Sequence, residues 1–482
     1  MSRRLLTIAA MLPLGACSMV PAYVRPAAPV PARFPTGATG EPGDTALPSV
    51  SYRDIFSDPR LQKIIDSALV NNRDLRIAAA NIDAARAQYR IQRAEQLPLV
   101  TSNNTVSVAD SGTGRTNNGG APVIGGQRTN YSLSLGVTQF EIDLFGRLAA
   151  LSKAEQARYF ASDVGARATR LTLIGDIAAA WLRYAADQSL ITIAEQTVAN
   201  AQSSVKLTRA RLDGGIAPRT DLAQAETVLA TAQSDLAQLA TSVDQDVNAL
   251  DLLVGAPVDR ALLPTAIETA AAGVAEPPMS LDSSVLLRRP DVVQAEYQLR
   301  AANAEVGAAR AALLPRLSLT VLAGLASNGL SQLFTSRAFN YTATPGVSYP
   351  VFAGGRSRAG LAQARAQFDG AVASYERTIQ TAFREVADAL ARRRTIDDQL
   401  DAQQRLVGAA TDTYRLTDAR YRGGVDSFLA NLDAQRSLYQ AQRSLVATQL
   451  TAATNRVTLY RTLGGDALVD IGADGPVPVA KP

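Results

Sequence analysis

The sequence holds few side chains that could do covalent or metal chemistry. Its 482 residues include no histidine and a single cysteine, Cys17. These absences exclude histidine or cysteine zinc sites, serine-histidine-aspartate and cysteine-histidine nucleophiles, and disulfide frameworks. No Gly-Lys pair is present, which excludes the phosphate-binding loop of nucleotide hydrolases. We therefore expect no enzyme activity, no metal site and no cofactor other than a group attached covalently to Cys17.

Cys17 lies at the end of a segment typical of a secretory signal. Two arginines near the start are followed by an apolar stretch and then by small residues. The last four residues, LGAC, resemble the bacterial lipobox, in which the signal is cut before a cysteine that carries acyl chains. We therefore expect removal of residues 1–16 and lipid on Cys17. Several acyl chains would anchor the new N-terminus durably, since a single chain binds a membrane only marginally. An ordinary signal with an incidental cysteine is the alternative.

The balance of charge gives little support to nucleic-acid binding. Lysine and arginine total 48 and aspartate and glutamate 44, a net charge of +4. Removal of residues 1–16 would take away two arginines and leave +2. The basic residues are scattered among acidic ones, whereas nucleic-acid binding favours a basic patch. We expect no nucleic-acid partner.

The chain contains two copies of one plan. A shift of 209 residues lays LTRARLDGG (residues 207–215) on LTDARYRGG (residues 416–424). The register continues without a gap as far as Gly255 and Gly464. So long a register indicates an internal repeat. Each half is predicted to run helix, strand, loop, strand, long helix, Gly-Gly turn, helix.

Two segments in each half alternate with the period of a β-strand. The pattern is clear in residues 131–139, 317–321 and 339–351 and weaker in residues 100–109. One face of each segment is apolar, and the other carries small residues, serine, threonine and asparagine. A half-buried soluble sheet is the alternative, but its exposed face normally carries charges. The pattern therefore favours a membrane barrel with lipid outside and a wet lumen.

Four strands cannot close a cylinder, so several chains must share the barrel. An open strand edge is not tolerated in hydrocarbon, because its N–H and C=O groups would be unpaired. Two copies would give eight strands and a filled barrel, and three would give twelve strands and room for a conduit. A homotrimer is the economical inference.

Two long proline-free stretches, residues 147–212 and 356–422, predict helices of unusual length. Shorter helices are expected over residues 72–96 and 219–254, which could stack end to end beside a long one. Alanine-rich seams permit close packing of such helices. A cytoskeletal coiled coil is the alternative, and the signal and the strands argue against it.

The repeats, the LGAC sequence and the motifs CSMVPAYVRP, FSDPRLQKII, DLFGR, PVFAGGR and RYRGGVDSFLANLDAQRSL together resemble the outer-membrane efflux family of TolC-like channels, in its OprM-type lipoprotein branch. The resemblance covers essentially the whole chain after the signal. It implies a mixed membrane protein, mainly α with β: a trimeric 12-stranded β-barrel with four strands per chain, continued by a 12-helix periplasmic α-barrel. It also implies an adaptor protein and an inner-membrane pump, of the proton-driven RND type, as partners, and outer-membrane lipid around the barrel.

The resemblance assigns two groups of residues to the periplasmic tip. The tip turns at which the family docks its adaptor correspond to Gly214, Gly215, Gly423 and Gly424. The residues that form the constriction of the channel in the family correspond to Tyr421, Arg422, Asp433 and Arg436. Three copies of Asp433 would form an acidic ring that favours cations, and bridges from Arg422 or Arg436 to acids of neighbouring helices would hold the tip shut. Relatives often carry a second acid where this chain has Ala430. Ordinary solvated helix charges are the alternative.

The expected function is a passive outer-membrane exit channel of a tripartite efflux pump for drugs or other small molecules, gated at the helix tips. The alternatives are the outer-membrane duct of a type I protein secretion system and a structural envelope protein. The predicted segments begin with a signal (1–16) and an acylated proline-rich leash (17–57). The first repeat consists of helices (58–98), strands (99–141) and tunnel helices (142–255), and a linker (256–279) follows. The second repeat consists of helices (280–315), strands (316–352) and tunnel helices (353–465), and a tail (466–482) ends the chain.

Overall fold

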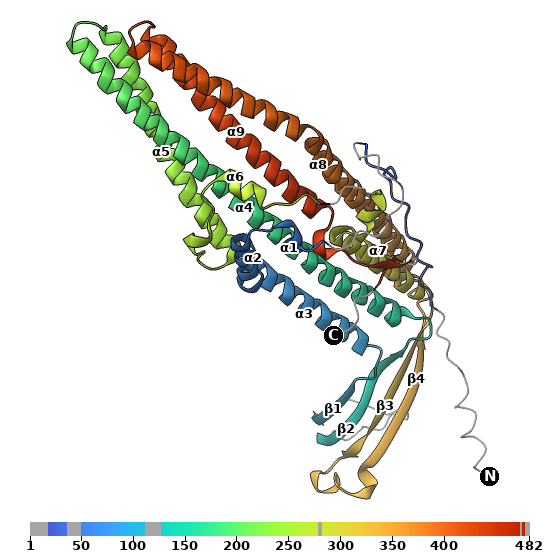
Figure 1. Ribbon diagram of the computed structural model, residues 1–482. Helices are drawn as coiled ribbons and strands as arrows, with labels where there is room; N and C mark the ends of the chain where they lie inside the picture. Colours follow the sequence, from blue (N-terminus) through green and yellow to red (C-terminus); the bar gives the residue numbers. More distant parts are fainter. Residues whose placement is uncertain (1–17, 36–49, 111–126, 278–281, 473–474, 478–482) are drawn as a thin grey trace. The chain divides into compact units, whose positions relative to one another are not determined.

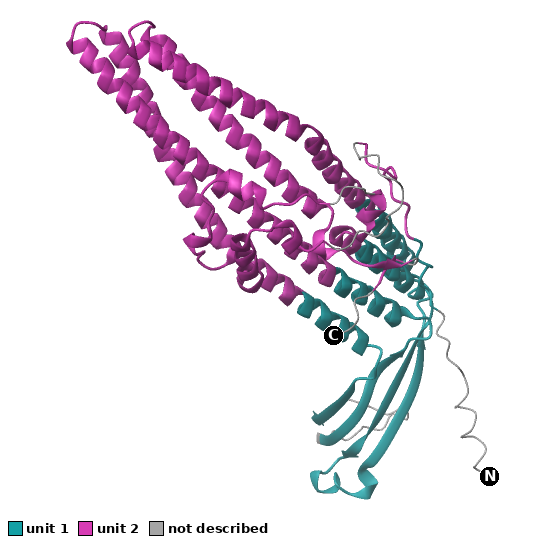
Figure 2. Cartoon of the chain, viewed as in Figure 1, with its two compact units in different colours: residues 1–24, 82–161, 296–374 teal, residues 25–81, 162–295, 375–482 magenta. Residues whose placement is uncertain are grey.

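The computed structural model describes residues 18–35, 50–110, 127–277, 282–472 and 475–477. Cys17, the expected signal and the loop 111–126 lie outside the described residues. The chain divides into two compact units (Figure 2). Unit 1 comprises residues 1–24, 82–161 and 296–374, and unit 2 comprises residues 25–81, 162–295 and 375–482.

The described residues are mainly helical, with one four-stranded sheet (Figure 1). The helices are α1 (Tyr52–Ile55), α2 (Pro59–Asn71), α3 (Arg73–Ala94), α4 (Arg147–Asp213), α5 (Arg219–Val254), α6 (Ile267–Ala272), α7 (Pro290–Ala311), α8 (Arg356–Arg422) and α9 (Phe428–Thr462). The strands are β1 (Val100–Asp110), β2 (Gln127–Ile142), β3 (Arg316–Ser327), β4 (Phe339–Ser348) and the short pair β5 (Ile471–Gly472) and β6 (Gly475–Pro476). Among the described helices, none has an apolar stretch long enough to cross a bilayer.

The sheet of unit 1 is a meander of order β1-β2-β3-β4 in which every pairing is antiparallel. Its register sorts side chains onto two faces. Leu135, Ala323 and Tyr341 form one cross-strand row of the apolar face. Ser134, Gly324 and Asn340 form the next row, on the opposite face. The apolar and polar faces predicted from the alternation are therefore present, and the apolar side chains are largely exposed, with Tyr341 at 76%.

The strand bounds differ from the predicted ones at three places. β3 continues to Ser327 rather than ending at residue 321. β4 ends at Ser348 rather than at residue 351, because its partner there, Arg316, is the first residue of β3. β2 is longer than expected, and its pairing with β3 shifts between Val137 and Phe140, where the Thr320 hydroxyl donates to the Thr138 carbonyl (2.9 Å). Such a bulge lets the strand bend and continue.

Unit 2 has a hydrophobic core in which the one tryptophan of the chain is fully buried. Trp181 on α4 packs with residues of α2, including Leu61 and Ile65. Its indole N–H donates to the carbonyl oxygen of Leu262 (3.2 Å), so the polar edge of the ring is satisfied where it is buried. The position of Trp181 between helices is structural.

Residues 18–35 of the predicted leash form no helix, whereas residues 52–55 form α1, and part of the first segment packs against α7. A Cβ added at Gly307 on α7 would lie 2.6 Å from the Cα of Val20, so glycine is needed for this approach. The Asn303 amide donates to the Pro21 carbonyl (2.9 Å). The Tyr23 hydroxyl donates to Glu296 (3.3 Å). Residues 20–23 therefore form a strap along α7.

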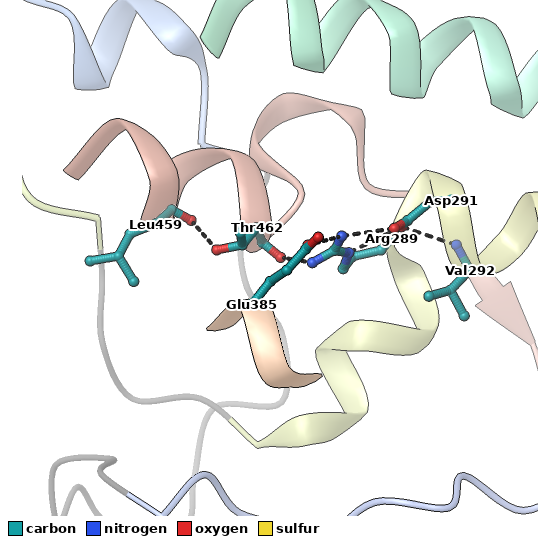
Figure 3. Close-up of polar contacts among 6 residues, drawn as sticks. All are labelled: Arg289, Asp291, Val292, Glu385, Leu459 and Thr462. Atoms are coloured by element: carbon teal, nitrogen blue, oxygen red, sulfur yellow. Dashed lines mark hydrogen bonds and ion pairs between the residues drawn. The ribbon is translucent and has the colours of Figure 1, made fainter. Parts of the chain in front are cut away.

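Arg289 links three segments of unit 2 from a nearly buried position (Figure 3). Its guanidinium donates to the carbonyl oxygen of Thr462 at the end of α9 (2.7 Å). It also donates to Asp291 at the start of α7 (2.7 and 3.0 Å) and to Glu385 of α8 (2.9 Å). The five N–H donors of an arginine make such a three-way link possible, and a lysine could not reproduce its planar geometry.

Asp246 of α5 is a buried carboxylate that has both a carboxylate, Asp187, and a guanidinium, Arg183, as neighbours. Burial, followed by the charge of Asp187 on α4, raises the pKa of Asp246 to about 7. The Arg183 guanidinium lies 3.3 Å from one Asp246 oxygen and opposes this shift. Between two carboxylates only a proton can supply a hydrogen bond, so Asp246 is expected to hold a proton at mildly acidic pH.

Replacement of Arg289 by methionine should destabilise the protein strongly. It would remove the guanidinium from two half-exposed carboxylates and leave the buried Thr462 carbonyl without this donor, and a hydrogen bond to a charged group contributes about 1.5–3 kcal/mol. Thermal unfolding in detergent, followed by circular dichroism, measures the effect. Arg415→Met is the control, because the pair of Arg415 with Asp412 is exposed on α8. Equal melting temperatures for the two variants would contradict the role of Arg289.

Because the pKa of Asp246 is raised in the folded state, we expect the free energy of unfolding to fall as the pH rises between about 4 and 7. In that range the folded state binds the extra proton and the unfolded state does not, so each increase in pH favours unfolding. Asp246→Asn can donate to Asp187 without a titrating proton and should flatten this slope and raise the melting temperature at pH 8. The measurement is the melting temperature from pH 4 to pH 8, with exposed Asp412→Asn as the control. A slope unchanged in Asp246→Asn would exclude the shared proton.

Candidate functional site

Two glycine-containing turns in unit 2 each join a long helix to a shorter one, α4 to α5 and α8 to α9. Gly215 has φ +73° and Gly424 has φ +76°, a left-handed conformation that strains any other L-residue. Gly214 and Gly423, which precede them, do not have positive φ. The second glycine of each pair is therefore the one that the backbone requires.

The two turns share one hydrogen-bond pattern, as the repeat predicts. The N–H of Ile216 donates to the Arg211 carbonyl (2.8 Å), and the N–H of Val425 donates to the Arg420 carbonyl (2.9 Å). This closing bond is that of a Schellman motif, which ends a helix on a left-handed residue. Arg420 also bonds Asp426 with two donors (2.7 and 2.9 Å), which fixes the second turn.

Each turn presents an apolar side chain to its surroundings within the described chain. Ile216 is 80% exposed and Val425 is 66% exposed. These two residues are related by the same 209-residue shift. An exposed aliphatic side chain on a rigid turn is suited to contact with another protein, although a single exposed side chain is also common on ordinary surfaces.

Tyr421 is buried between the two helical hairpins. Its hydroxyl shares a hydrogen bond with that of Thr208 on α4 (3.2 Å). Its ring packs on Phe428 at the start of α9, with ring centroids 5.4 Å apart. Ala225 of α5 and Leu432 of α9 complete the cluster. Tyr421 thus joins α8 and α9 to α4 and α5 within one chain.

Arg211 of α4 also contacts Tyr421, and we call this cluster of contacts around Tyr421 the joint between the two hairpins. Its guanidinium lies 4.4 Å from the centroid of the Tyr421 ring, a distance typical of a cation–π contact. It also donates to the carbonyl oxygens of Tyr421 (2.9 Å) and Arg422 (3.1 Å) at the end of α8. These oxygens carry the negative end of the α8 dipole, so a cation is favoured there.

The other expected constriction residues do not join this cluster. Arg422 pairs with Asp418 one turn earlier on its own helix (2.8 Å) and not with an acid of a neighbouring helix. Asp433 and Arg436 are exposed on α9. In the part of the chain that the structure describes, neither has a hydrogen-bond or ion-pair partner, so both are available to other molecules.

The sequence argument missed Thr208, Arg211 and Phe428. A signal was present in the repeat itself. The 209-residue shift pairs Tyr421 with Leu212 and Phe428 with Arg219, so both aromatic residues occur in the second copy alone. Two aromatic residues gained together near one turn indicate a packing site, although they do not name the partner on α4.

Comparison with known proteins identifies the family of the chain. The pattern that defines the family described as outer membrane efflux protein matches residues 64–256 and 281–465. The probable efflux pump outer membrane protein TtgC of Pseudomonas putida is 42% identical over 455 residues, 94% of this chain and 93% of its own. The outer membrane protein OprJ of Pseudomonas aeruginosa is 36% identical over 458 residues, 94% of each chain.

Solved structures give the same result. The structure of CusC, described in connection with transmembrane channel formation, has a TM-score of 0.83 at 35% identity and covers 93% of this chain and 100% of its own. The open state of the MtrE outer membrane channel of Neisseria gonorrhoeae has a TM-score of 0.81 at 33% identity, with 94% and 99% covered. By sequence and by fold, the chain belongs to the outer membrane efflux protein family.

Proposed function

We propose that this chain is the outer-membrane exit channel of a tripartite efflux pump and conducts small organic molecules passively. The observation that carries the proposal is the sheet of unit 1, whose exposed apolar face suits lipid and whose polar face suits water. Relatives are named as efflux pump outer membrane proteins for toluene, solvents and antibiotics. These names favour small molecules over secreted polypeptides as the cargo.

Three chains together would close the barrel. β1 and β4 are the two edges of the sheet, and each has a neighbour on one side only among the described strands. These edges would be intolerable in hydrocarbon unless copies of the chain paired them. Three copies supply twelve strands, and twelve leave a lumen wide enough for a conduit.

The turns and the joint at Tyr421 would be the periplasmic end of this channel. Ile216 and Val425, beside Gly214, Gly215, Gly423 and Gly424, would meet the periplasmic adaptor. Three copies of Asp433 would form an acidic ring, with Arg436 one turn further along α9 and Arg422 near the turn. The Tyr421 joint holds the two hairpins of one chain together, so opening the tip would require either its rupture or movement of both hairpins as one body.

The energy for export would come from outside this chain. We assign it to a proton-driven RND pump of the inner membrane, reached through the adaptor. The lipid anchor on Cys17 stays a prediction. It is supported by the LGAC sequence and by the strap of residues 20–23, which would hold the anchored end of the chain against α7.

The barrel proposal distinguishes the two faces of the sheet. Leu135→Lys places a charge on the apolar face and should reduce assembly, because lysine at the bilayer midplane of a barrel costs about 2–4 kcal/mol. Thr342→Lys, on the polar face, should assemble normally. Native mass measurement of protein extracted from outer membranes reports assembly, and the wild type should be a trimer. A wild-type monomer with an intact sheet would contradict the shared barrel.

Deletion of the gene should raise the accumulation of a fluorescent efflux substrate and the sensitivity to detergents, and the intact gene should reverse both. Loss of the exit channel blocks export even when the pump is present. Accumulation of the dye in whole cells is the measurement. Loss of a secreted polypeptide with normal dye efflux would favour a secretion duct, and no change in either would leave a structural role.

Asp433→Ala should raise the conductance of the closed channel and weaken its preference for cations, because the acidic ring would be lost. Single-channel recording in planar bilayers measures both quantities. Asp412→Ala removes an exposed acid of α8 and serves as the control. If the Asp433 variant conducts and selects as the wild type does, Asp433 is not part of the gate.

A further inference from the structure

Unit 1 contains a cavity where its sheet meets two of its helices. The cavity has a volume of about 740 Å³ and lies among the end of α7, the first residue of β3, the residues at and after the end of β4, and the first turns of α8. Its polar lining comes from Arg316, Ser348, Arg356, Ser357 and Gln363. The rest of the lining is apolar and small, mostly alanine with Leu314 and Pro350.

The register of the sheet shows which face this cavity belongs to. Arg316 pairs with Ser348, and Ser318 pairs with Gly346, so both pairs lie on the polar face. The intervening pair, Leu317 with Val347, lies on the apolar face. In the proposed barrel the apolar face meets lipid, so Arg316 and the cavity would open to the lumen.

The cavity carries two positive charges without a negative one. No acidic residue lines it. In the described part of the chain, neither the Arg316 guanidinium nor that of Arg356 has a hydrogen-bond or ion-pair partner. The acid opposite Ser318, Glu141 on β2, is already held by Arg147 through two hydrogen bonds of 2.7 and 2.8 Å. Glu141 therefore takes no hydrogen bond from Arg316, although the charge of Arg316 acts on this carboxylate through space.

We propose that this cavity binds the acidic group of an anionic amphiphile, a carboxylate or sulfonate with an apolar body, during its passage through the channel. Guanidinium groups bind carboxylates by paired, charge-assisted hydrogen bonds. The alanine, leucine and proline lining accommodates an apolar body, and a volume of 740 Å³ lies in the range of drug-sized sites. The inference rests on the proposed function, because the lumen exists only in the assembled channel.

The chemistry of the cavity implies weak, reversible binding. Both arginines are exposed in the chain, so water competes for their donors and limits the affinity. A conducting pathway needs sites that attract a molecule and then release it. Each trimer would hold three such sites, one per chain.

The test measures binding of 1-naphthoate, a fluorescent carboxylate, to the trimer in lipid nanodiscs by equilibrium dialysis, with empty nanodiscs subtracted. Arg316→Gln and Arg356→Gln should each weaken binding by about tenfold, as expected for loss of one charge-assisted contact. Arg358→Gln is the matched control, because Arg358 is an exposed arginine of the same helix outside the cavity. Neutral 2-naphthol should bind equally to all variants, and the cation 1-naphthylmethylammonium should bind to the cavity variants no more weakly than to the wild type.

Equal binding of 1-naphthoate to the wild type and both cavity variants would overturn the proposal. So would loss of the trimer in Arg316→Gln or Arg356→Gln, since the arginines would then pair with an acid of a neighbouring copy. Conductance of the same preparations in planar bilayers distinguishes failure of the cavity proposal from failure of the proposed channel function. A wild type that forms channels but shows no arginine-dependent binding defeats this inference alone, whereas a wild type without channels defeats the proposed function.

Discussion

Backbone groups at the edge of a sheet have no partner in hydrocarbon, and this constraint governs the proposed assembly. The sheet has β1 at one edge and β4 at the other. Because its pairings are all antiparallel and its strands are even in number, β1 and β4 run in opposite directions. The β4 of one copy can therefore pair with the β1 of the next in the same antiparallel manner. Pairing of this kind is heterologous and produces a closed ring when the rotation between copies allows it.

The internal repeat explains the common backbone of the two hairpins, and the departures from the repeat explain their contact. Gly215 and Gly424 close equivalent turns with nearly equal φ angles. Tyr421 and Phe428 have no aromatic counterpart in the first copy, and they form the cluster that joins the hairpins. The repeat thus accounts for two similar helical hairpins, and the residues in which the two copies differ form the contact between them. A change that weakens this joint would affect the tip without altering either turn.

The sequence predicted those features whose causes are local. The bounds of α5 and α8 agree with the predicted ranges, because Pro218, Gly255 and the glycines around both ends of α8 act on the adjacent backbone. Contacts between distant residues were not predicted. Thr208 meets Tyr421, and Val20 meets Gly307, only after the helices have packed. The leash was expected to be extended, whereas residues 20–23 pack along α7 and residues 52–55 form α1.

The two proposed charge sites would act on passing molecules independently. Asp433 would favour cations at the tip, whereas Arg316 and Arg356 would attract acids beside the sheet. Each field is short-ranged, because the Debye length at physiological ionic strength is about 8 Å. A passive site lowers the free energy of a bound molecule equally for entry and for exit, so these residues can set how long a molecule stays but not the direction in which it travels. The direction must come from the energy-driven partner.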